Sequence, residues 1–297
     1  MKRILVTGAS GFLGANLVSR LLNKGNIEVI AILGRPEDKA HFLPQGKNII
    51  VYPSSQLFTT DFGHVDTLIH TAFSRGDNMQ GLVSSIDLTE KVIELVNDQN
   101  IDSFLNISTQ GLYQGLKPGE KAAEDGLICP NTAYGLAKWA VENMLKIGCH
   151  KFHTSIRMAS LSSNARFLDF FVDRVIANVE IRVTAPRQFA SIMDVSDAVE
   201  GILSIEEIPL SQRDIVYNLG PEVQYSILDY AKMADVVGKS FGFASQGIIV
   251  DDSGKEFSIC MDCSRLREQT KWACRIDDEI MIQKLFQDKL HAQHQTD

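Results

Sequence analysis

The fold is decided by residues 3–22, which read RILVTGASGFLGANLVSRLL. The apolar run at residues 3–7 predicts a buried strand that ends directly at Gly8. Residues 15–23 carry leucine and valine side chains at helical spacing, so they predict a helix that ends near Gly25. A strand, a glycine-rich turn and a helix in this order form the start of a βαβ unit.

The glycine-rich turn predicts a dinucleotide-binding site. Glycines permit a tight turn and let backbone N–H groups approach a pyrophosphate at the N-terminus of the following helix. The position of the turn between a strand and a helix is the context that such a site requires. We expect six residues of the turn to contact the dinucleotide: Gly8, Ser10, Gly11, Phe12, Leu13 and Gly14.

The rest of the chain continues the alternation of strands and helices. Further strands are predicted at residues 28–33, 48–52, 67–71, 103–107 and 153–157, and long helices at residues 82–97 and 133–147. This alternation indicates parallel βαβ units with right-handed crossovers. The predicted fold class is therefore α/β, a Rossmann doubly wound parallel sheet with a smaller mixed α/β C-terminal substrate domain.

The alternation loosens after Arg157, and this change suggests two interleaved domains. We expect residues 1–157 to form the dinucleotide-binding Rossmann domain and residues 190–220 to return to it. Residues 158–189 and 221–290 are expected to form the smaller substrate-binding domain. No clear linker separates the two parts, so a single boundary would be artificial.

The charge balance excludes several classes of partner. With 37 acidic and 29 basic residues among 297, the chain has a net charge of −8. An acidic surface repels phosphate backbones, so we expect no nucleic-acid partner. No apolar run approaches the ~18 residues of a membrane span, so we expect no membrane partner. The first residues are too weakly apolar for a signal peptide, and we expect a cytoplasmic protein.

The cysteines do not suggest a metal site. There are five, and only Cys260 and Cys263 form a CxxC motif, with no second pair or nearby histidine to complete a zinc site. We expect no metal. A redox pair stays an alternative because the motif could begin a helix. The plainer interpretation is reduced cysteines that pack as small apolar side chains.

The end of the second predicted strand bears on the identity of the dinucleotide. An NAD site usually has an acidic residue about 20 residues after the glycines. Here Gly34 and Arg35 follow the strand, and Arg35 could pair with the 2′-phosphate of NADP. We therefore expect NADP. NAD stays an alternative because Glu37 and Asp38 follow shortly, in which case Arg35 is a solvated loop charge.

Tyr134 and Lys138 form a candidate acid–base pair on the predicted helix at residues 133–147. A spacing of four places the phenol and the ammonium on one face of the helix. The neighbouring ammonium favours the phenolate and lowers the pKa of the tyrosine, which makes the phenol a usable acid or base for a carbinol or carbonyl oxygen. The alternative is an ordinary surface pair, since this spacing is common by chance.

Ser108 and Thr109 lie at the predicted end of the fifth strand. Ligands of open α/β sheets bind beyond the carboxyl ends of the strands, so either hydroxyl could face the cofactor. Such a hydroxyl could bind the reacting oxygen and hold it against Tyr134. The alternative is a simple turn rich in serine and threonine.

Together these segments resemble the extended short-chain dehydrogenase/reductase family, of the NAD-dependent epimerase/dehydratase type. TGASGFLG resembles the TGxxGxxG turn of that family, and IHTA resembles its HLAA strand end. ISTQGLYQG is similar to its serine/threonine segment, YGLAK to its Tyr and Lys, DVSDAV to its HVDDVA and YNLG to its YNxG. The resemblance runs from Met1 to about Leu290 and so covers nearly the whole chain.

The resemblance implies roles for particular residues. It makes Thr109, Tyr134 and Lys138 the catalytic set, and it adds Thr71 and Ala72, with Tyr134 and Lys138, to the cofactor contacts. The substrate positions that it implies are Ser108, Thr109, Ser160, Arg187 and Asp194.

The chain departs from the family pattern mainly on the substrate side. Ser160 replaces the asparagine of RPxN, and Asp194 replaces the histidine of HVDD. The arginine usual just before that segment falls at Ala190, so Arg187 would have to shift to serve. Gln110 and Gly111 follow Thr109 where dehydratases usually have an acidic pair, which speaks against a dehydratase.

The resemblance implies a homodimeric enzyme that acts on a nucleotide-linked sugar. Our first expectation is an NADP-dependent reductase of a 4-keto (deoxy)sugar nucleotide that serves polysaccharide synthesis. The second is a nucleotide-sugar 4-epimerase of the UDP-glucose type with tightly bound NAD. A catalytically silent dinucleotide-binding protein and a reductase of a non-nucleotide carbonyl are further alternatives. The helices at residues 82–97 and 133–147 are the candidate dimer surface.

Overall fold

The computed structural model describes residues 1–34, 43–44, 46–74, 78–116, 120–254 and 259–294. The chain forms two compact units. Unit 1 consists of Met1–Leu112, Pro130–Met158 and Val199–Tyr217, and unit 2 of Tyr113–Cys129, Ala159–Ala198 and Asn218–Asp297. Each unit is therefore assembled from three separate segments of the chain.

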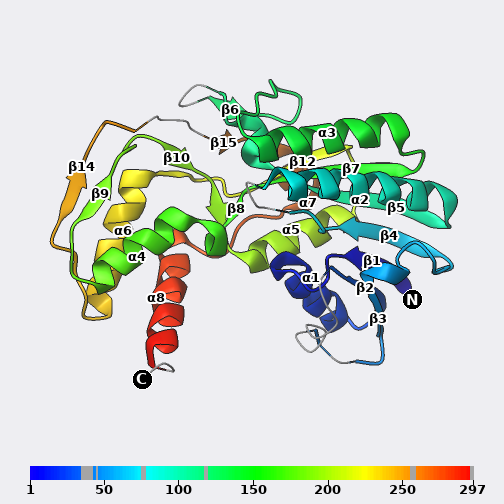
Figure 1. Ribbon diagram of the computed structural model, residues 1–297, viewed down its shortest axis with the longest axis horizontal. Helices are drawn as coiled ribbons and strands as arrows, with labels where there is room; N and C mark the ends of the chain where they lie inside the picture. The colour runs from blue at the N-terminus through cyan, green and yellow to red at the C-terminus, as the bar shows by residue number, and fades with distance from the viewer. Residues whose placement is uncertain (35–42, 45, 75–77, 117–119, 255–258, 295–297) are drawn as a thin grey trace. The chain divides into compact units, whose positions relative to one another are not determined.

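A seven-stranded sheet in the order β12-β7-β5-β4-β1-β2-β3 is the centre of the fold (Figure 1). Its strands are β1 (Lys2–Thr7), β2 (Ile27–Leu33), β3 (Ile49–Pro53), β4 (Val65–His70), β5 (Ile101–Thr109), β7 (Phe152–Met158) and β12 (Val216–Leu219). The pairings from β3 to β7 are all parallel. The strand order reverses next to β1, as in a doubly wound sheet. The predicted Rossmann fold class is confirmed.

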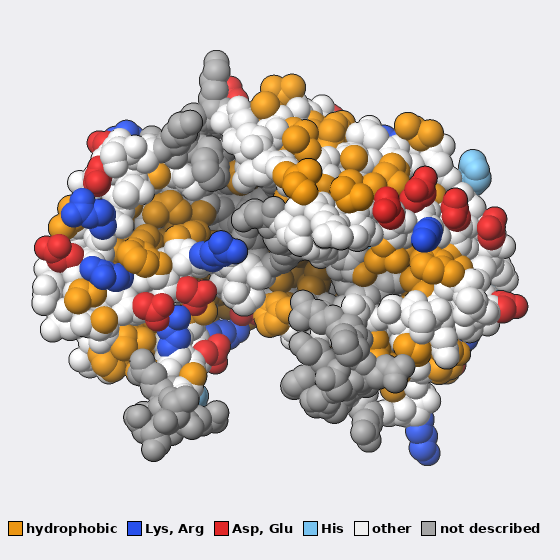
Figure 2. Space-filling model, viewed as in Figure 1, with side chains coloured by type: hydrophobic (Ala, Val, Ile, Leu, Met, Phe, Trp, Pro, Cys, Tyr) orange, Lys and Arg blue, Asp and Glu red, His pale blue; other side chains and the backbone are white. Residues whose placement is uncertain are grey.

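Helices α2 (Met79–Asp98) and α3 (Ala133–Gly148) pack side by side against one face of this sheet (Figure 1). Their buried side chains, such as Val92 and Val141, join sheet residues such as Leu68 in one apolar core. The outer faces of the two helices also carry apolar side chains, and Figure 2 shows several over α3. On this exposed surface Val83 and Leu136 keep 51% and 55% of their area accessible.

Helix α1 (Phe12–Asn23) and the unit 1 part of α5 (Val195–Glu207) lie next to each other. Two ion pairs join them, Arg20 with Glu200 and Lys24 with Glu207. The apolar stripe of α1 contains Leu17, which is fully buried. It packs on the sheet face opposite α2 and α3 (Figure 1).

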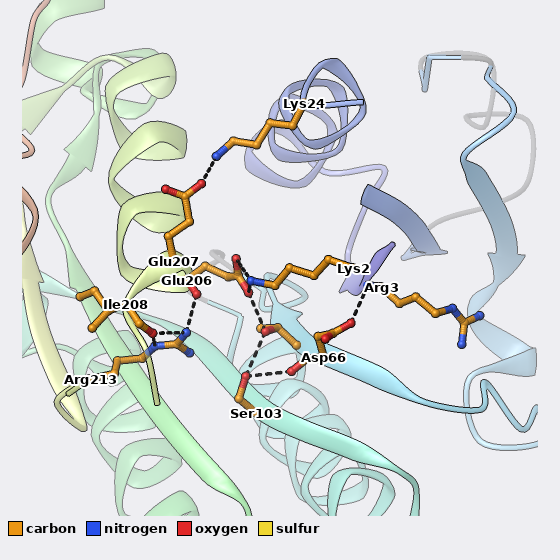
Figure 3. Close-up of polar contacts among 10 residues, drawn as sticks. Lys2, Arg3, Lys24, Asp66, Ser103, Glu206, Glu207, Ile208 and Arg213 are labelled. Atoms are coloured by element: carbon orange, nitrogen blue, oxygen red, sulfur yellow. Dashed lines mark hydrogen bonds and ion pairs between the residues drawn. The ribbon is translucent and has the colours of Figure 1, made fainter. Parts of the chain in front are cut away.

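Glu206 fixes the end of α5 to the sheet (Figure 3). Its buried carboxylate accepts hydrogen bonds from the Lys2 ammonium at 2.7 Å and from the Thr67 hydroxyl at 2.8 Å. Arg213 donates to the backbone carbonyls of Glu206 and Ile208. These contacts secure the returning segment, residues 199–217, within unit 1.

Unit 2 is built on helices and very short strands. Its helices are α4 (Arg166–Ile176), α6 (Ile227–Ser240), α7 (Ser264–Thr270) and α8 (Asp278–His294). Its two-stranded sheets pair β8 (Ser160–Leu161) with β11 (Ile192–Met193), β9 (Ile181–Val183) with β14 (Ile248–Val250), β10 (Phe189–Ala190) with β13 (Tyr225–Ser226), and β6 (Lys121–Ala122) with β15 (Cys260–Met261). Helices α4, α6 and α8 share an apolar core that contains Phe171, Tyr230 and Phe286.

No helix in the described part of the chain is long and apolar enough to span a membrane.

Candidate functional site

The turn after β1 depends on its glycines. Gly8 has a φ of +71°, a left-handed conformation that suits glycine. A Cβ at Gly8 would lie 2.9 Å from the Cα of Ala72, and a Cβ at Gly14 would overlap the carbonyl group of Gly8. The backbone of the turn is therefore packed so closely that larger residues would displace it.

The N-terminus of α1 begins within this turn. Gly11 is the N-cap residue and supplies no side-chain cap, so the first turn of the helix presents backbone N–H groups only. The Gly11 N–H itself donates to the Gly8 carbonyl at 2.9 Å. The hydroxyl of Ser10 accepts a hydrogen bond from the Gly34 N–H at 3.2 Å, which ties the turn to the end of β2. Uncapped donors and a glycine-lined cradle suit the pyrophosphate of a dinucleotide.

The segment after β4 packs against the same turn. Thr71 donates its hydroxyl to the Thr7 carbonyl at 2.7 Å, and Ala72 is the residue that a Cβ at Gly8 would strike. The structure therefore brings Thr71 and Ala72 next to the glycines, as the cofactor prediction requires. Arg35, Glu37 and Asp38 lie outside the described residues. The structure therefore does not test whether Arg35 would bind the 2′-phosphate of NADP.

His70, the last residue of β4, is buried directly before this segment, and its ring is neutral. Its Nδ1 lies 2.7 Å from the Thr7 hydroxyl and its Nε2 lies 3.1 Å from the Thr89 hydroxyl. Burial, together with the nearby Lys138 ammonium, lowers the pKa of His70 to about 3. His70 therefore joins β1, β4 and α2 through hydrogen bonds at neutral pH and adds no charge.

Tyr134 and Lys138 occupy successive turns near the N-terminus of α3. Thr132 caps this helix by accepting a hydrogen bond from the Gly135 N–H at 3.1 Å. The ammonium of Lys138 is buried and donates to the Ile107 carbonyl at 2.7 Å. It lies 5.9 Å from the centroid of the Tyr134 ring. The predicted pair is therefore held against the carboxyl end of β5.

Thr109 ends β5 and precedes the short helical turn at Gln110–Tyr113. Its hydroxyl accepts a hydrogen bond from the Gly111 N–H at 3.1 Å. A Cβ at Gly135 would lie 2.9 Å from the Gly111 carbonyl oxygen, so the segment after Thr109 packs directly on the first turn of α3. The structure thus brings together the two segments that carry Thr109 and Tyr134.

Ser108 points to a different set of partners. Its hydroxyl donates to the Glu142 carboxylate at 2.5 Å, and the Ser108 side chain is buried. The same carboxylate forms an ion pair with Arg157 of β7 at 2.8 Å, and both side chains are almost completely buried. The Glu142 carboxylate of α3 thus joins β5, through Ser108, and β7, through Arg157.

Two residues near the site were missed by the motif-based reasoning. Glu142 lies four residues after Lys138 and so on the same face of α3, a signal that the spacing could have given. Phe73 follows Ala72 directly, and its ring lies 3.7 Å from the Lys138 ammonium and 6.0 Å, centroid to centroid, from the Tyr134 ring. No spacing rule indicates Phe73, because strand order alone brings it to α3.

The three predicted substrate residues outside β5 all belong to unit 2. Ser160 is exposed in β8, and its N–H donates to the Ser191 carbonyl at 3.2 Å. Arg187 is exposed and lies 3.3 Å from the Asp252 carboxylate. Asp194 is buried: burial disfavours its charged form, but hydrogen bonds from Lys284 and Ser196 outweigh that effect and lower its pKa.

The CxxC cysteines are free thiols in the structure. Cys260 lies in β15 and Cys263 is the N-cap residue of α7. Burial raises the pKa of Cys263 to about 12, so this thiol stays protonated at neutral pH. A protonated thiol is a poor nucleophile, which favours a packing role over a redox role.

Comparison with known proteins adds a family and a set of relatives. The model of the NAD dependent epimerase/dehydratase family matches residues 4–220. A putative UDP-glucose 4-epimerase from Methanocaldococcus jannaschii is 21% identical over 92% of this chain and 94% of its own length. A dTDP-glucose 4,6-dehydratase from Streptomyces griseus is 22% identical over 92% of this chain and 90% of its own length.

Solved structures share the fold. The UDP-glucuronic acid 4-epimerase from Bacillus cereus, in complex with UDP-glucuronic acid and NAD, superposes with a TM-score of 0.78 at 21% identity. The superposition covers 97% of this chain and 99% of the epimerase.

Proposed function

Because the chain belongs to the NAD dependent epimerase/dehydratase family, we propose that it is a 4-epimerase of a nucleotide-linked sugar. The observation that carries the proposal is the assembly of Thr109, Tyr134 and Lys138 at the carboxyl end of β5. The names of the relatives support the substrate class, since the two epimerases and the dehydratase are all named for a sugar nucleotide and for carbon 4.

Tyr134 is the group that moves the proton. Its phenolate accepts the proton of the sugar hydroxyl as that carbon is oxidised, and the resulting phenol returns the proton on reduction. Lys138 is a buried ammonium near the ring, so it favours the phenolate and brings the phenol closer to the acidity that the step needs. Thr109 orients the reacting oxygen through its hydroxyl.

The residues around β1 fit a nicotinamide dinucleotide. The pyrophosphate would rest on Gly8, Ser10, Gly11, Phe12, Leu13 and Gly14, with Thr71 and Ala72 beside it. Lys138 would bind the ribose next to the nicotinamide. When bound, the nicotinamide supplies the hydride acceptor and donor. We propose NAD as the cofactor, and the related Bacillus cereus epimerase was solved with NAD.

The substrate residues of unit 2 are proposed to bind the nucleotide-linked sugar. Ser160 offers an exposed hydroxyl, and Arg187 offers a guanidinium suited to a diphosphate. Asp194 is charged but already bound by Lys284, so we assign it to positioning this region. Gln110 and Gly111 supply no acidic pair after Thr109, which disfavours dehydration as the outcome.

A 4-keto sugar reductase is the second candidate, and one observation favours it. The described end of β2 is Leu33 followed by Gly34, so no carboxylate stands there to bind the ribose hydroxyls of NAD. Arg35 is the next residue and would suit the extra phosphate of NADP. The two candidates differ in whether cofactor is consumed.

The test combines cofactor content with turnover. Purified protein is denatured and the released dinucleotide identified, and the protein is then incubated with UDP-glucose and with UDP-glucuronic acid while absorbance at the reduced-nicotinamide band is followed. The epimerase proposal predicts a released NAD, a 4-epimeric product and no net change in absorbance. Steady consumption of NADPH with a 4-keto sugar would replace it with the reductase.

We also propose a homodimer through α2 and α3. Both helices expose apolar side chains on their outer faces, among them Val83 and Leu136. Exposed apolar side chains on neighbouring helices are a feature of protein interfaces. Sedimentation velocity should give twice the mass of 32.9 kDa, and Leu136→Glu should shift the protein to monomer.

A further inference from the structure

Phe73 contacts both side chains of the proposed acid–base pair. The Lys138 ammonium lies over its ring, 3.7 Å from the ring centroid. This distance is well within the ~6 Å range of a cation–π contact. The edge-to-face contact with Tyr134 has a centroid distance of 6.0 Å and an interplanar angle of 79°. One aromatic side chain therefore connects the ammonium and the phenol.

The position of Phe73 is fixed by the backbone on both sides. The preceding Thr71 is bonded to the Thr7 carbonyl at 2.7 Å. The following Ser74 donates its N–H to the Ser85 hydroxyl of α2 at 2.9 Å. The ring itself packs against the apolar core between the sheet and α2. Phe73 is thus flanked by hydrogen-bonded residues and packed on an apolar core.

The ring forms part of the surroundings of a buried cation. Lys138 is 3% exposed, so its ammonium has lost most of its water and needs protein partners. One partner is the Ile107 carbonyl at 2.7 Å. The negative face of the Phe73 ring is another partner. It stabilises the ammonium without placing an acidic residue beside Tyr134. A carboxylate in that place would oppose the phenolate, whereas an aromatic face stabilises the ammonium without adding a charge.

We propose that Phe73 is a positioning residue, which holds the Lys138 ammonium at the end of β5 and orients the ring of Tyr134. The proposal deepens the function proposed above and rests on it for its consequence in catalysis. It requires an aromatic ring at this position. An apolar filler of similar volume would preserve the packing but would lose both the cation–π contact and the edge-to-face contact.

The test measures the phenol directly, with no substrate. The protein contains six tyrosines, so labelling their ring Cζ with ¹³C gives few NMR resonances, and Tyr134→Phe identifies the one of interest. The resonance is followed against pH in the wild type, in Phe73→Leu, which removes the ring, and in the matched control Phe73→Tyr, which keeps it. The residue that Phe73→Tyr adds gives one further resonance, identified by comparison with the wild type.

We expect Phe73→Leu to raise the titration midpoint of Tyr134 by about one pH unit, because the ammonium is held less firmly beside the phenol. Phe73→Tyr should leave the midpoint unchanged. In turnover assays the acidic limb of the kcat profile should move to higher pH in Phe73→Leu alone. An unchanged Tyr134 midpoint in a folded Phe73→Leu protein would overturn the proposal. If circular dichroism shows Phe73→Leu to be unfolded, Phe73→Met serves in its place with the same two outcomes.

The two proposals fail in different ways. If the wild type converts no sugar nucleotide but the Tyr134 midpoint still depends on the ring at position 73, the function is wrong and the positioning role stands. If conversion occurs and the midpoint is insensitive to Phe73→Leu, the function stands and Phe73 only fills space.

Discussion

The catalytic candidates of unit 1 and the substrate candidates of unit 2 are built in different ways. Thr109, Tyr134 and Lys138 stand at the ends of a long strand and a long helix, and buried hydrogen bonds fix the surrounding backbone. Ser160 and Arg187 stand in or between two- and three-residue strands and are exposed. In the proposed function, long elements hold the catalytic residues and short elements hold the residues that would bind the substrate.

The buried charges sharpen this contrast. In unit 1 the Glu142–Arg157 pair is almost completely buried and joins three elements. In unit 2 the partner of Asp194, Lys284, is about half exposed, and that of Arg187, Asp252, more than half. Losing a buried partner leaves an uncompensated charge, whereas an exposed partner is replaced by water. Loss of the Glu142–Arg157 pair should therefore cost more stability than loss of either of these unit 2 pairs.

The largest effect is expected from Tyr134→Phe. Removing the phenol removes the proton carrier, so kcat should fall by about 10²–10⁴-fold. Binding of NAD, measured by calorimetry, should change little, because the ring remains. A variant that retains most of its kcat would show that another group carries the proton and would remove the basis of the unit 1 site.

The next effect concerns stability. Glu142→Ala leaves Arg157 buried without its carboxylate, and the free energy of unfolding should fall by about 3–5 kcal/mol. Urea denaturation measures this loss. Glu142→Gln keeps the shape and the Ser108 contact but removes the charge, and it separates packing from electrostatics. A loss below about 1 kcal/mol in Glu142→Ala would place this pair with the weak pairs of unit 2.

A third prediction concerns the cofactor turn. Gly14→Ala places a methyl group against the Gly8 carbonyl, so the turn must shift at a cost of about 1–3 kcal/mol. The affinity for NAD should fall with it, as measured by calorimetry. Gly46→Ala is the matched control, since a Cβ there meets no atom of the described residues within 4 Å. Equal affinities in the two variants would contradict a cofactor site at this turn.

The smallest effect is expected in unit 2 and depends on pH. The folded-state pKa of Asp194 is lowered, so its charge stabilises the fold above the ordinary Asp pKa of about 4. That contribution is lost as the pH falls through the folded-state pKa. Between pH 7 and pH 3 the wild type should lose about 1 kcal/mol more stability than Asp194→Asn, a modest value because Lys284 is half exposed. Equal losses in the two proteins would show that the ion pair contributes nothing.

The sequence predicts the long helices and strands far better than the very short ones. The helix predicted at residues 133–147 coincides with α3, and the strand predicted at residues 103–107 lies within β5. Long elements with one buried face leave a periodic pattern in the sequence. Two-residue strands such as β8 leave none. For helix α7 the sequence offers only the possibility that the CxxC motif begins a helix, since its seven residues bury only Leu266.

The missed site residues show the same limit. Thr109, Tyr134 and Lys138 could be proposed from motifs, because their spacing along one strand or helix is local. Phe73 reaches Lys138 only because β4 pairs with β5 and α3 packs on β5, a tertiary relation that one sequence does not display. Ser108 could be expected near the end of the strand. Its hydrogen bond to Glu142 could not, because it depends on how α3 packs on the sheet.

The measurement that tests the central claim most directly uses a nucleotide sugar deuterated at carbon 4. The protein is incubated with UDP-glucuronic acid labelled at this position, without added cofactor, and the product is examined by mass spectrometry and NMR. The account predicts the 4-epimer with deuterium still on carbon 4, because the group removed from that carbon returns to it within one active site. A product without the label, or no epimer with this sugar or with labelled UDP-glucose, would contradict it.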